Sequence, residues 1–321
     1  MNTTEKINAA KGLDDLYPVF DEARYTAGWH KKRRSLWKEP ATEFTPRHWS
    51  YAEAYAALEK ASQWIDTELA ERRNLLMFNP VGDNDYDTVR TLVSAYQMIK
   101  PNEHARAHRH TPNALRLVLD AGPGLFTVVN GVKIPMIPGD VLLTPGGCWH
   151  SHYNEGADTA CWIDFLDVPL VHRLEPMFYD EHPDVYQTVA EEPVAHPYWF
   201  KRADIDAALD KAAPDENGVC RQLLASAEHM LTMDLTCIRM PAGARIGPQR
   251  DTASRIFAVT KGAGTFSSGD QSFAFKRGDV FAAPGWARHE ITAAEECDLF
   301  EVNDRPALDK LGFYIREAWE G

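Results

Sequence analysis

Histidines gather in one stretch of this chain at a spacing that suits metal binding. The chain has 12 histidines, and five of them fall within 49 residues: His104, His108, His110, His150 and His152. Because alternate residues of a strand point to the same face, His108 and His110 would present two imidazoles side by side. A third ligand must come from another strand, and His150 is well placed for it. The His-x-His pair by itself is equally consistent with ordinary surface histidines.

The region around these histidines is patterned as a series of short strands. From about Leu92, apolar runs alternate with Gly, Pro and Asn, which is typical of an all-β sandwich or barrel. Asn130 and Gly131 accept the positive φ angles of a type I′ turn and predict a hairpin. The runs are Ala114–Leu119, Leu125–Val129, Val132–Met136, Val141–Leu143 and Ala160–Phe165.

Other segments show different patterns. Residues 1–50, rich in Pro, aromatics and charge, predict an extended arm with little regular structure. An apolar stripe at helical spacing predicts a helix between Tyr51 and Leu69. A short helix is expected over Asp204–Ala213, ended by Pro214, and a closing helix over Ala307–Trp319.

The two strand-rich regions repeat each other. An offset of 139 residues relates Gly139-Asp140-Val141 to Gly278-Asp279-Val280, Pro145-Gly146 to Pro284-Gly285, and His150 to His289. Upstream, Arg109-His110-Thr111 corresponds to Arg250-Asp251-Thr252 at an offset of 141. An ordered series of this kind indicates an internal duplication. The second copy has Gln249-Arg250-Asp251 in place of His-x-His and Trp286 in place of a glycine, so we expect it to be a scaffold and oligomer surface without a metal.

Composition limits the classes of protein to consider. With 44% hydrophobic and 25% charged residues, the chain has the composition of a globular protein. A formal net charge of −13 argues against non-specific binding to nucleic acid or to an anionic membrane, and the basic cluster Lys31–Arg34 is expected to be a solvated loop. The five cysteines form no C-x-x-C pair, and no apolar run is long enough to span a bilayer or to serve as a secretory signal. We expect a cytoplasmic protein.

The histidine region resembles the cupin superfamily. Its second motif, G-x5-P-x-G-x2-H-x3-N, is satisfied by Gly139, Pro145, Gly147, His150 and Asn154. Its first motif, G-x5-H-x-H-x3–4-E-x6-G, is met at His108, His110 and Gly122, with Asn102 in place of the leading glycine. The usual glutamate is absent, since Ala114 or Leu115 stands there. A trio of neutral imidazoles would leave positions open for substrate and oxygen.

A closer resemblance is to the gentisate/salicylate 1,2-dioxygenase family of bicupins, which includes 5-nitrosalicylate and 1-hydroxy-2-naphthoate dioxygenases. It is dense over about residues 90–170, weaker over 234–300 and faint in the N-terminal arm. The matching runs are Ala107-His108-Arg109-His110-Thr111, Ala114-Leu115-Arg116, Leu143-Thr144-Pro145, Trp149-His150-Ser151-His152 and Trp162–Pro169.

The resemblance implies an all-β bicupin, with two jelly-roll barrels, an N-terminal helical arm and a few connecting helices. We expect an arm and helix over residues 1–90, a metal-binding catalytic cupin over 91–170, a connecting segment over 171–233, and a degenerate cupin with a closing helix over 234–321. It also suggests a homo-oligomer, often a tetramer.

The implied activity is that of a non-haem Fe(II) extradiol-type 1,2-dioxygenase with one iron per chain, in the first cupin. Such an enzyme uses O2 to open a salicylate-type aromatic ring between the carboxyl-bearing C1 and the hydroxyl-bearing C2. His108, His110 and His150 would be the iron ligands. Gentisate and 5-nitrosalicylate are the leading substrates, although salicylate and 1-hydroxy-2-naphthoate stay open.

Four further residues are candidates for the site. Arg116 lies six residues after His110, an even spacing that would direct it into the same cavity, where a guanidinium could bind the substrate carboxylate. His152, on the face of His150, matches a family histidine that contacts bound oxygen or substrate and relays a proton. Gln97 and Asp164 match pocket-lining positions, with structural hydrogen bonding as the alternative.

Two other functions stay open. One is another metal-dependent cupin enzyme, such as an isomerase or decarboxylase, because a fold does not determine a reaction. The other is a non-catalytic bicupin that binds a small molecule. The missing glutamate, together with Arg116 and His152, favours the dioxygenase over the first, and the intact histidine trio disfavours the second.

Overall fold

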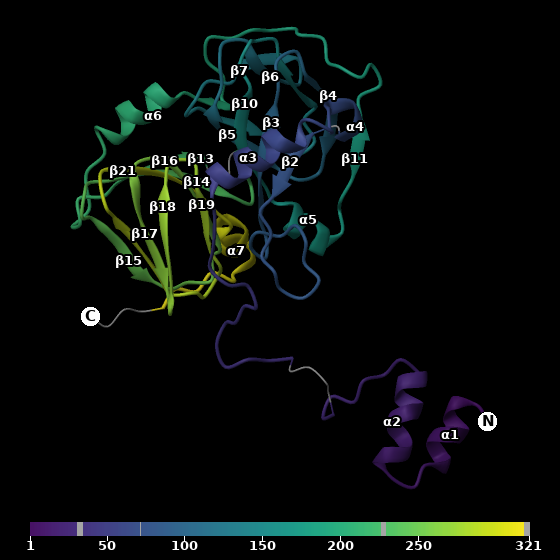
Figure 1. Ribbon diagram of the computed structural model, residues 1–321. Coiled ribbons are helices and arrows are strands. Elements are labelled where there is room, and N and C mark those ends of the chain that lie inside the picture. Colours follow the sequence, from purple (N-terminus) through teal and green to yellow (C-terminus); the bar gives the residue numbers. More distant parts are fainter. Residues whose placement is uncertain (31–34, 71, 226–228, 318–321) are drawn as a thin grey trace. The chain divides into compact units, whose positions relative to one another are not determined.

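The computed structural model describes residues 1–30, 35–70, 72–225 and 229–317. They belong to two compact units, Met1–Ala41 and Thr42–Gly321 (Figure 1). The basic cluster Lys31–Arg34, expected to be a solvated loop, lies outside the described residues. Among the described residues, no helix is both long enough and apolar enough to cross a bilayer.

The first unit contains two helices, α1 (Thr3–Ala9) and α2 (Leu13–Glu22), so the prediction of an arm with little regular structure was wrong here. The side chain of Asn2 accepts the backbone N–H of Glu5, and the Glu5 side chain accepts that of Asn2, which forms a capping box. Val19 is the one buried residue of the two helices. Leu13, Leu16, Tyr17 and Phe20 recur at helical spacing, so this segment does carry a local helical signal in its sequence.

The first barrel consists of two antiparallel sheets. One has the strand order β12-β8-β5-β10-β3-β2 and the other the order β11-β4-β9-β6-β7. The bounds are β2 Arg73–Leu76, β3 Val93–Ile99, β4 His104–His110, β5 Ala114–Asp120, β6 Leu125–Val129, β7 Val132–Pro135, β8 Val141–Thr144, β9 His150–Asn154, β10 Ala160–Leu166, β11 Tyr179–Glu181 and β12 Trp199–Phe200. The predicted hairpin is confirmed, because Asn130 and Gly131 join β6 to β7 with φ angles of 47° and 80°.

The second barrel repeats this arrangement. Its sheets have the orders β1-β19-β16-β21-β14-β13 and β15-β20-β17-β18. The bounds are β1 Arg47–Trp49, β13 Cys220–Ala225, β14 Asp234–Met240, β15 Arg245–Gln249, β16 Arg255–Lys261, β17 Ala263–Ser268, β18 Gln271–Lys276, β19 Val280–Ala283, β20 His289–Ala293 and β21 Cys297–Asn303. The predicted all-β bicupin with an internal duplication is therefore confirmed.

Helices connect and close the barrels. The helix predicted over 51–69 is divided into α3 (Tyr51–Ala61) and α4 (Thr67–Ala70). The helix expected over Asp204–Ala213 is α6 (Arg202–Leu209), and α5 (Val168–Leu174) follows β10. The closing helix α7 (Arg305–Leu311) is shorter than predicted because Gly312 ends it in a left-handed conformation. Trp319, the expected end of that helix, lies outside the described residues.

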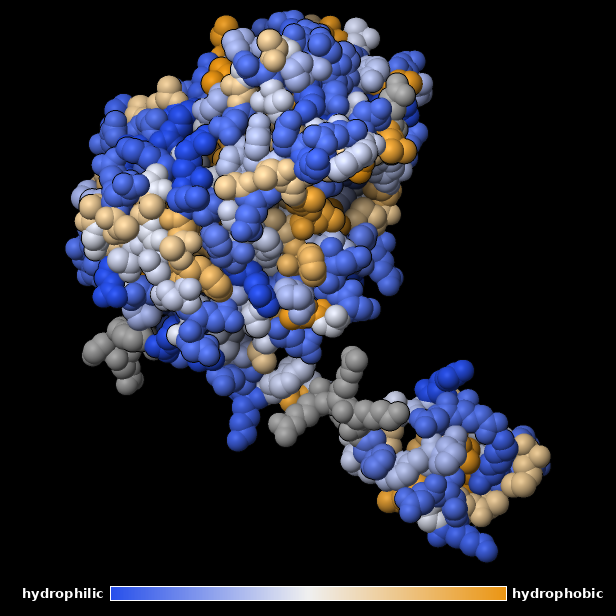
Figure 2. Space-filling model, in the orientation of Figure 1, coloured by the Kyte–Doolittle hydropathy of each residue, from blue (hydrophilic) through white to orange (hydrophobic). Residues whose placement is uncertain are grey.

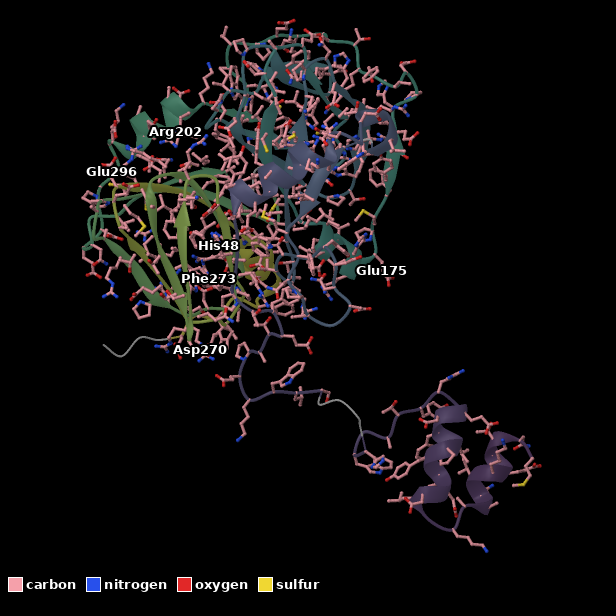
Figure 3. The ribbon with its side chains drawn as sticks, viewed as in Figure 1. His48, Glu175, Arg202, Asp270, Phe273 and Glu296 are labelled. Atoms are coloured by element: carbon pink, nitrogen blue, oxygen red, sulfur yellow. The ribbon has the colours of Figure 1, made fainter. Side chains whose placement is uncertain are left out.

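Each repeat lends a strand to the other barrel. β1, which precedes α3, pairs with β19 of the second barrel, whereas β12, which precedes α6, pairs with β8 of the first. The aspartate of each repeated Gly-Asp motif accepts a hydrogen bond from the first residue of the helix that follows the exchanged strand. Asp279 accepts the backbone N–H of Tyr51 at the start of α3. Asp140 accepts the backbone N–H of Arg202, which Figure 3 labels at the start of α6. The segments predicted as arm and connection thus tie the barrels together.

A continuous apolar core lies between the barrels. Leu115 and Phe165 of the first barrel belong to the same buried cluster as Ile256 and Phe300 of the second. The rings of Phe165 and Phe300 are 5.7 Å apart in an edge-to-face arrangement. The opposite faces of these sheets line the barrel interiors, because side chains alternate along each strand.

Candidate functional site

The structure brings His108, His110 and His150 together in the first barrel. His108 and His110 lie on β4, and His150 opens β9, directly opposite His108 in the pairing register. All three are buried, and one ligand atom from each lies within 4.8 Å of the others. Within the part of the chain that the structure describes, no other group of His, Cys, Asp and Glu side chains meets the same criterion.

Backbone carbonyls orient the three rings. The Nδ1 atoms of His108, His110 and His150 lie 3.1, 2.9 and 3.1 Å from the carbonyl oxygens of Arg106, Pro112 and Cys148, respectively. Since a carbonyl only accepts, each Nδ1 must carry the hydrogen and each Nε2 must keep its lone pair. Among the described residues, the buried Nε2 atoms of His110 and His150 have no hydrogen-bond partner. This donor set fits a metal ion.

The surroundings keep these imidazoles neutral. Burial, with a smaller contribution from the positive charge of Arg72, lowers the pKa of His108 to about 2 and that of His110 to about 4. Burial, followed by repulsion from His108, also holds the pKa of His150 well below its usual value. Neutral imidazole is the form that binds metals, so these three rings could bind one at neutral pH without first losing a proton.

A cavity of about 390 Å³ opens beside these histidines. Its wall includes four of the residues that the sequence predicted for the site: Gln97, His110, Arg116 and Asp164. Gln97 is buried at the centre of β3, next to Trp162 of β10 in the register.

Arg116 faces the cavity, but not for the reason that the sequence suggested. His110 ends β4 in one sheet and Arg116 lies on β5 in the other, so even spacing along one strand does not apply. The two side chains meet because the sheets face each other across the barrel. The Arg116 Nη1 atom donates to Thr144 Oγ1 at 2.7 Å, and burial lowers the pKa of Arg116 to about 10.

Asp164 is the partner of Arg116. Its Oδ1 atom lies 3.2 Å from Arg116 Nε, without the alignment of a hydrogen bond, and its Oδ2 atom accepts from Trp162 Nε1 at 3.0 Å. Burial raises the pKa of Asp164, and the charge of Arg116 opposes that rise. Both carboxylate oxygens are therefore directed at protein groups.

His152 lies next to the histidine trio. It is fully buried, and its ring centre is 6.1 Å from that of His150 and 5.3 Å from that of Trp162. Its Nδ1 atom has no hydrogen-bond partner among the described residues. Burial, followed by repulsion from Arg116, holds its pKa well below the usual value.

The sequence did not point to several other residues of the cavity wall. Asn74 lies on the edge strand β2, and Arg72 directly precedes that strand. Tyr86 lies in the loop between β2 and β3, and His172 lies on α5. All four fall in segments that the sequence analysis assigned to the arm or to the connection. The clearest available signal was the pair Arg72-Arg73 shortly before the apolar run Leu75–Phe78.

The second barrel has no comparable site among its described residues. The position of Arg116, which pairs with Leu142, is taken by Phe257, which pairs with Phe281. His289 is buried, and its Nε2 atom lies 2.9 Å from Gln249 Nε2. Asp251 forms an ion pair with Arg255 at 2.7 Å. Aromatic rings thus occupy the barrel interior, and the groups that could have bound a metal are paired with other residues.

Comparison with known proteins agrees with this arrangement. A cupin-domain family model matches residues 95–168, which span the histidine trio and most of the cavity wall. The chain resembles a solved salicylate 1,2-dioxygenase from Pseudaminobacter salicylatoxidans with a TM-score of 0.87 and 25% identity, covering 96% of this chain and 97% of that one.

Curated relatives extend over most of the chain. It is 30% identical to a 1-hydroxy-2-naphthoate 1,2-dioxygenase from Nocardioides sp. strain KP7, over 85% of this chain and 78% of the relative. It is 29% identical to a 5-aminosalicylate 1,2-dioxygenase from Comamonas sp., covering 96% and 90% of the two chains. A gentisate 1,2-dioxygenase from Streptomyces sp. is 28% identical over 97% of both. The chain therefore belongs to the gentisate/salicylate 1,2-dioxygenase family, a group of ring-cleaving dioxygenases with the bicupin fold.

Proposed function

We propose that this protein is a non-haem Fe(II) dioxygenase that opens the ring of an aromatic ortho-hydroxy carboxylate with O2. The observation that carries the proposal is the buried trio of His108, His110 and His150 next to a cavity whose wall contains Arg116. The trio supplies the ligands of a metal, and the arginine supplies a partner for a carboxylate.

The donor set supports iron. Neutral imidazoles suit Fe(II), and three of them without a protein carboxylate leave coordination positions for a substrate and for O2. Bound there, iron would couple electrons of the substrate to oxygen, a transfer that amino-acid side chains do not perform. Backbone carbonyls that hold the Nδ1–H groups keep the three rings oriented toward one point.

Arginines of the cavity would bind the substrate carboxylate. Arg116 is buried and fixed by Thr144, so its guanidinium is positioned before the substrate arrives. Arg72 adds a second positive charge to the cavity wall. We infer that Asp164 positions Arg116 and does not contact the substrate carboxylate, because its two oxygens face Arg116 and Trp162 and two carboxylates would repel each other.

His152 and Gln97 complete the proposed chemistry. His152 is neutral and buried, with an Nδ1 atom that makes no hydrogen bond among the described residues, so it could accept a proton from the substrate hydroxyl or hold bound oxygen. Gln97 would offer hydrogen bonds from the same wall. The bond broken would be the one between C1 and C2, in the extradiol-type manner, with both oxygen atoms entering the product.

The relatives act on salicylates with different substituents or a fused ring, so the substrate is best tested as a panel. The protein would be loaded with Fe(II) and mixed with gentisate, 5-aminosalicylate, 5-nitrosalicylate, salicylate and 1-hydroxy-2-naphthoate. We expect oxygen uptake matched by loss of the aromatic absorbance and by a product containing both oxygen atoms of labelled O2. Conversion of these acids without oxygen uptake would indicate a different cupin enzyme, and tight binding without conversion would indicate a binding protein.

We further propose that the chain assembles into a homo-oligomer, with a tetramer as the leading form. In support, hydrophobic side chains gather on the face over β2 and α5 (Figure 2). Among the residues of these elements, Leu75 and Leu174 are exposed. Exposed apolar surface of this kind is typical of an interface. Light scattering during size-exclusion chromatography would give the mass, and a monomer at all concentrations would contradict the proposal.

A further inference from the structure

Two polar side chains that the proposed chemistry does not use meet at the cavity wall. The Tyr86 hydroxyl lies 2.6 Å from His172 Nδ1, and the two rings are perpendicular, with their centres 5.6 Å apart. Both side chains line the cavity. His172 is exposed and Tyr86 is half-buried, which places the pair where the cavity meets solvent.

The local structure holds this pair in place. Tyr86 lies in a turn organised by Asn84, whose side chain donates to the carbonyls of Asn79 and Asp87 at 2.7 and 2.9 Å. His172 is on α5, whose C-terminal end is marked by Glu175 in Figure 3. The neighbouring Arg173 donates to the Arg90 carbonyl at 3.2 Å and pairs with Asp87 at 3.4 Å. The turn and the helix are thus joined at several points.

The register of the first barrel's six-stranded sheet, β12-β8-β5-β10-β3-β2, shows where Tyr86 and His172 lie relative to Arg116. Three parallel rows of side chains cross the inner face of that sheet. The inner row is Asn74, Gln97 and Trp162, the middle row is Leu76, Ala95, Asp164 and Arg116, and the outer row is Val93, Leu166 and Ala114. Val168 and His172 follow Leu166 along the chain on α5, so the Tyr86–His172 pair lies beyond the outer row.

This order determines how a ring would lie in the cavity. Buried Trp162 closes the inner end, where its ring packs against His152. An aromatic acid whose carboxylate binds Arg116 in the middle row must therefore extend toward the outer row. Since Ala95, Val93, Leu166 and Ala114 offer only apolar contacts, Tyr86 and His172 are the polar groups that the far edge of the ring meets.

We propose that Tyr86 and His172 form a specificity site for a polar substituent on the ring edge remote from the carboxylate and its ortho hydroxyl, a site that rests on the proposed function. In either tautomer of His172, the pair keeps one donor and one acceptor after the hydrogen bond between its members is made. A hydroxyl or amino group at that ring position matches both, and a nitro group accepts from the donor. A hydrogen atom there satisfies neither.

The test compares substrates with and without this substituent. Tyr86→Phe removes the hydroxyl and keeps the ring, and Tyr314→Phe removes a hydroxyl that donates to Asp251 in the second barrel and serves as the matched control. We expect Tyr86→Phe to lower kcat/KM for gentisate about three- to tenfold relative to salicylate, the effect of one partly exposed hydrogen bond. His172→Phe should lower the same ratio, and the control should leave it unchanged.

A binding measurement separates this proposal from the proposed function. With Zn²⁺ in place of iron, calorimetry should show the same relative loss of affinity for gentisate in Tyr86→Phe, without any need for turnover. If Tyr86→Phe lowers the affinity for gentisate and for salicylate equally, or changes neither affinity, the specificity site is overturned while the proposed dioxygenase activity stands. Absence of oxygen uptake by the wild-type protein with every acid would instead overturn the proposed function.

Discussion

At the scale of single residues, His150 and His289 show how neighbours decide what a side chain can do. Both open a strand in the same position of their barrels, and both place Nδ1 against the carbonyl two residues earlier, at 3.1 and 2.9 Å. The difference lies at Nε2, which in His150 is grouped with two other imidazoles and in His289 lies 2.9 Å from Gln249. The same residue is a ligand candidate in one barrel and a hydrogen-bonded core residue in the other.

This pair supplies a matched test of the proposed metal centre. We expect His150→Ala to lower the bound iron per chain more than tenfold and to abolish turnover, because two imidazoles remain of the proposed three ligands. His289→Ala removes an equally buried ring and should keep its iron. Elemental analysis of both proteins, with circular dichroism to confirm folding, checks this; equal iron loss in the two variants would contradict the assignment. His110→Ala should behave as His150→Ala does.

Arg116 allows a test of substrate capture without loss of metal. Arg116→Gln, combined with Asp164→Asn so that no buried carboxylate is left without its partner, should raise KM about 10- to 100-fold while iron content is unchanged. A phenol that lacks the carboxylate should bind the variant as well as it binds the wild type. If both ligands lose affinity equally, Arg116 shapes the cavity and does not bind the carboxylate.

At the scale of elements, an aspartate directly follows a central strand of each barrel, β10 or β21, and ties that strand to the other repeat. Asp167 precedes α5 and accepts from Asn113 and from Thr232 of the second repeat. Asp304 precedes α7 and accepts from the Ser254 backbone and from Thr91 of the first repeat. Burial raises the pKa of both, that of Asp304 from 3.8 to about 6.

The raised pKa of Asp304 predicts a pH dependence of stability. The folded chain holds this proton up to about pH 6, whereas the unfolded chain releases it near 3.8, so folding takes up a proton between these values. The Asp304 contribution to stability is therefore greatest at low pH and declines as pH rises through that window, by up to about 3 kcal/mol.

Comparison with Asp304→Asn isolates this contribution. Relative to the variant, the wild type should lose stability between about pH 4 and pH 7, measured by urea unfolding at several pH values. Asp309→Asn, which changes an exposed carboxylate on α7, is the control and should show little of this change. A wild-type-minus-variant difference that does not change with pH would show that Asp304 does not titrate in this range.

At the scale of the whole molecule, the two barrels are not independent bodies. Thr42–Gly321 is one compact unit, and one buried cluster passes from Leu115 and Phe165 in the first barrel to Ile256 and Phe300 in the second. The exchanged strands β1 and β12 reinforce this core. The second barrel thus supports the first mechanically, although it lacks a comparable histidine cluster among its described residues.

A substitution in the second barrel should therefore affect metal retention in the first. Phe300→Ala leaves a cavity in the shared core and should cost about 3–5 kcal/mol. On heating, iron release and loss of circular dichroism should occur together and at a lower temperature than in the wild type. Unfolding in two steps, with iron retained through the first, would show that the barrels unfold separately.

The sequence alone identified those features that depend on local spacing. Strand periodicity and the Asn130-Gly131 turn predicted the barrel strands, and the 139-residue offset predicted the duplication. Motif spacing predicted that His108, His110 and His150 lie together, as they do in the structure. These signals are readable because hydrophobic period, turn conformation and motif spacing act over a few neighbouring residues.

The tertiary structure decided which distant residues meet. No local pattern indicates that β1 and β12 exchange barrels, that Asp164 pairs with Arg116, or that Tyr86 and His172, 86 residues apart, share one edge of the cavity. Arg116 reaches the histidines across two sheets, not along one strand. Such contacts arise when sheets pack face to face, because burial brings together side chains whose separation along the chain carries no information about their distance in space.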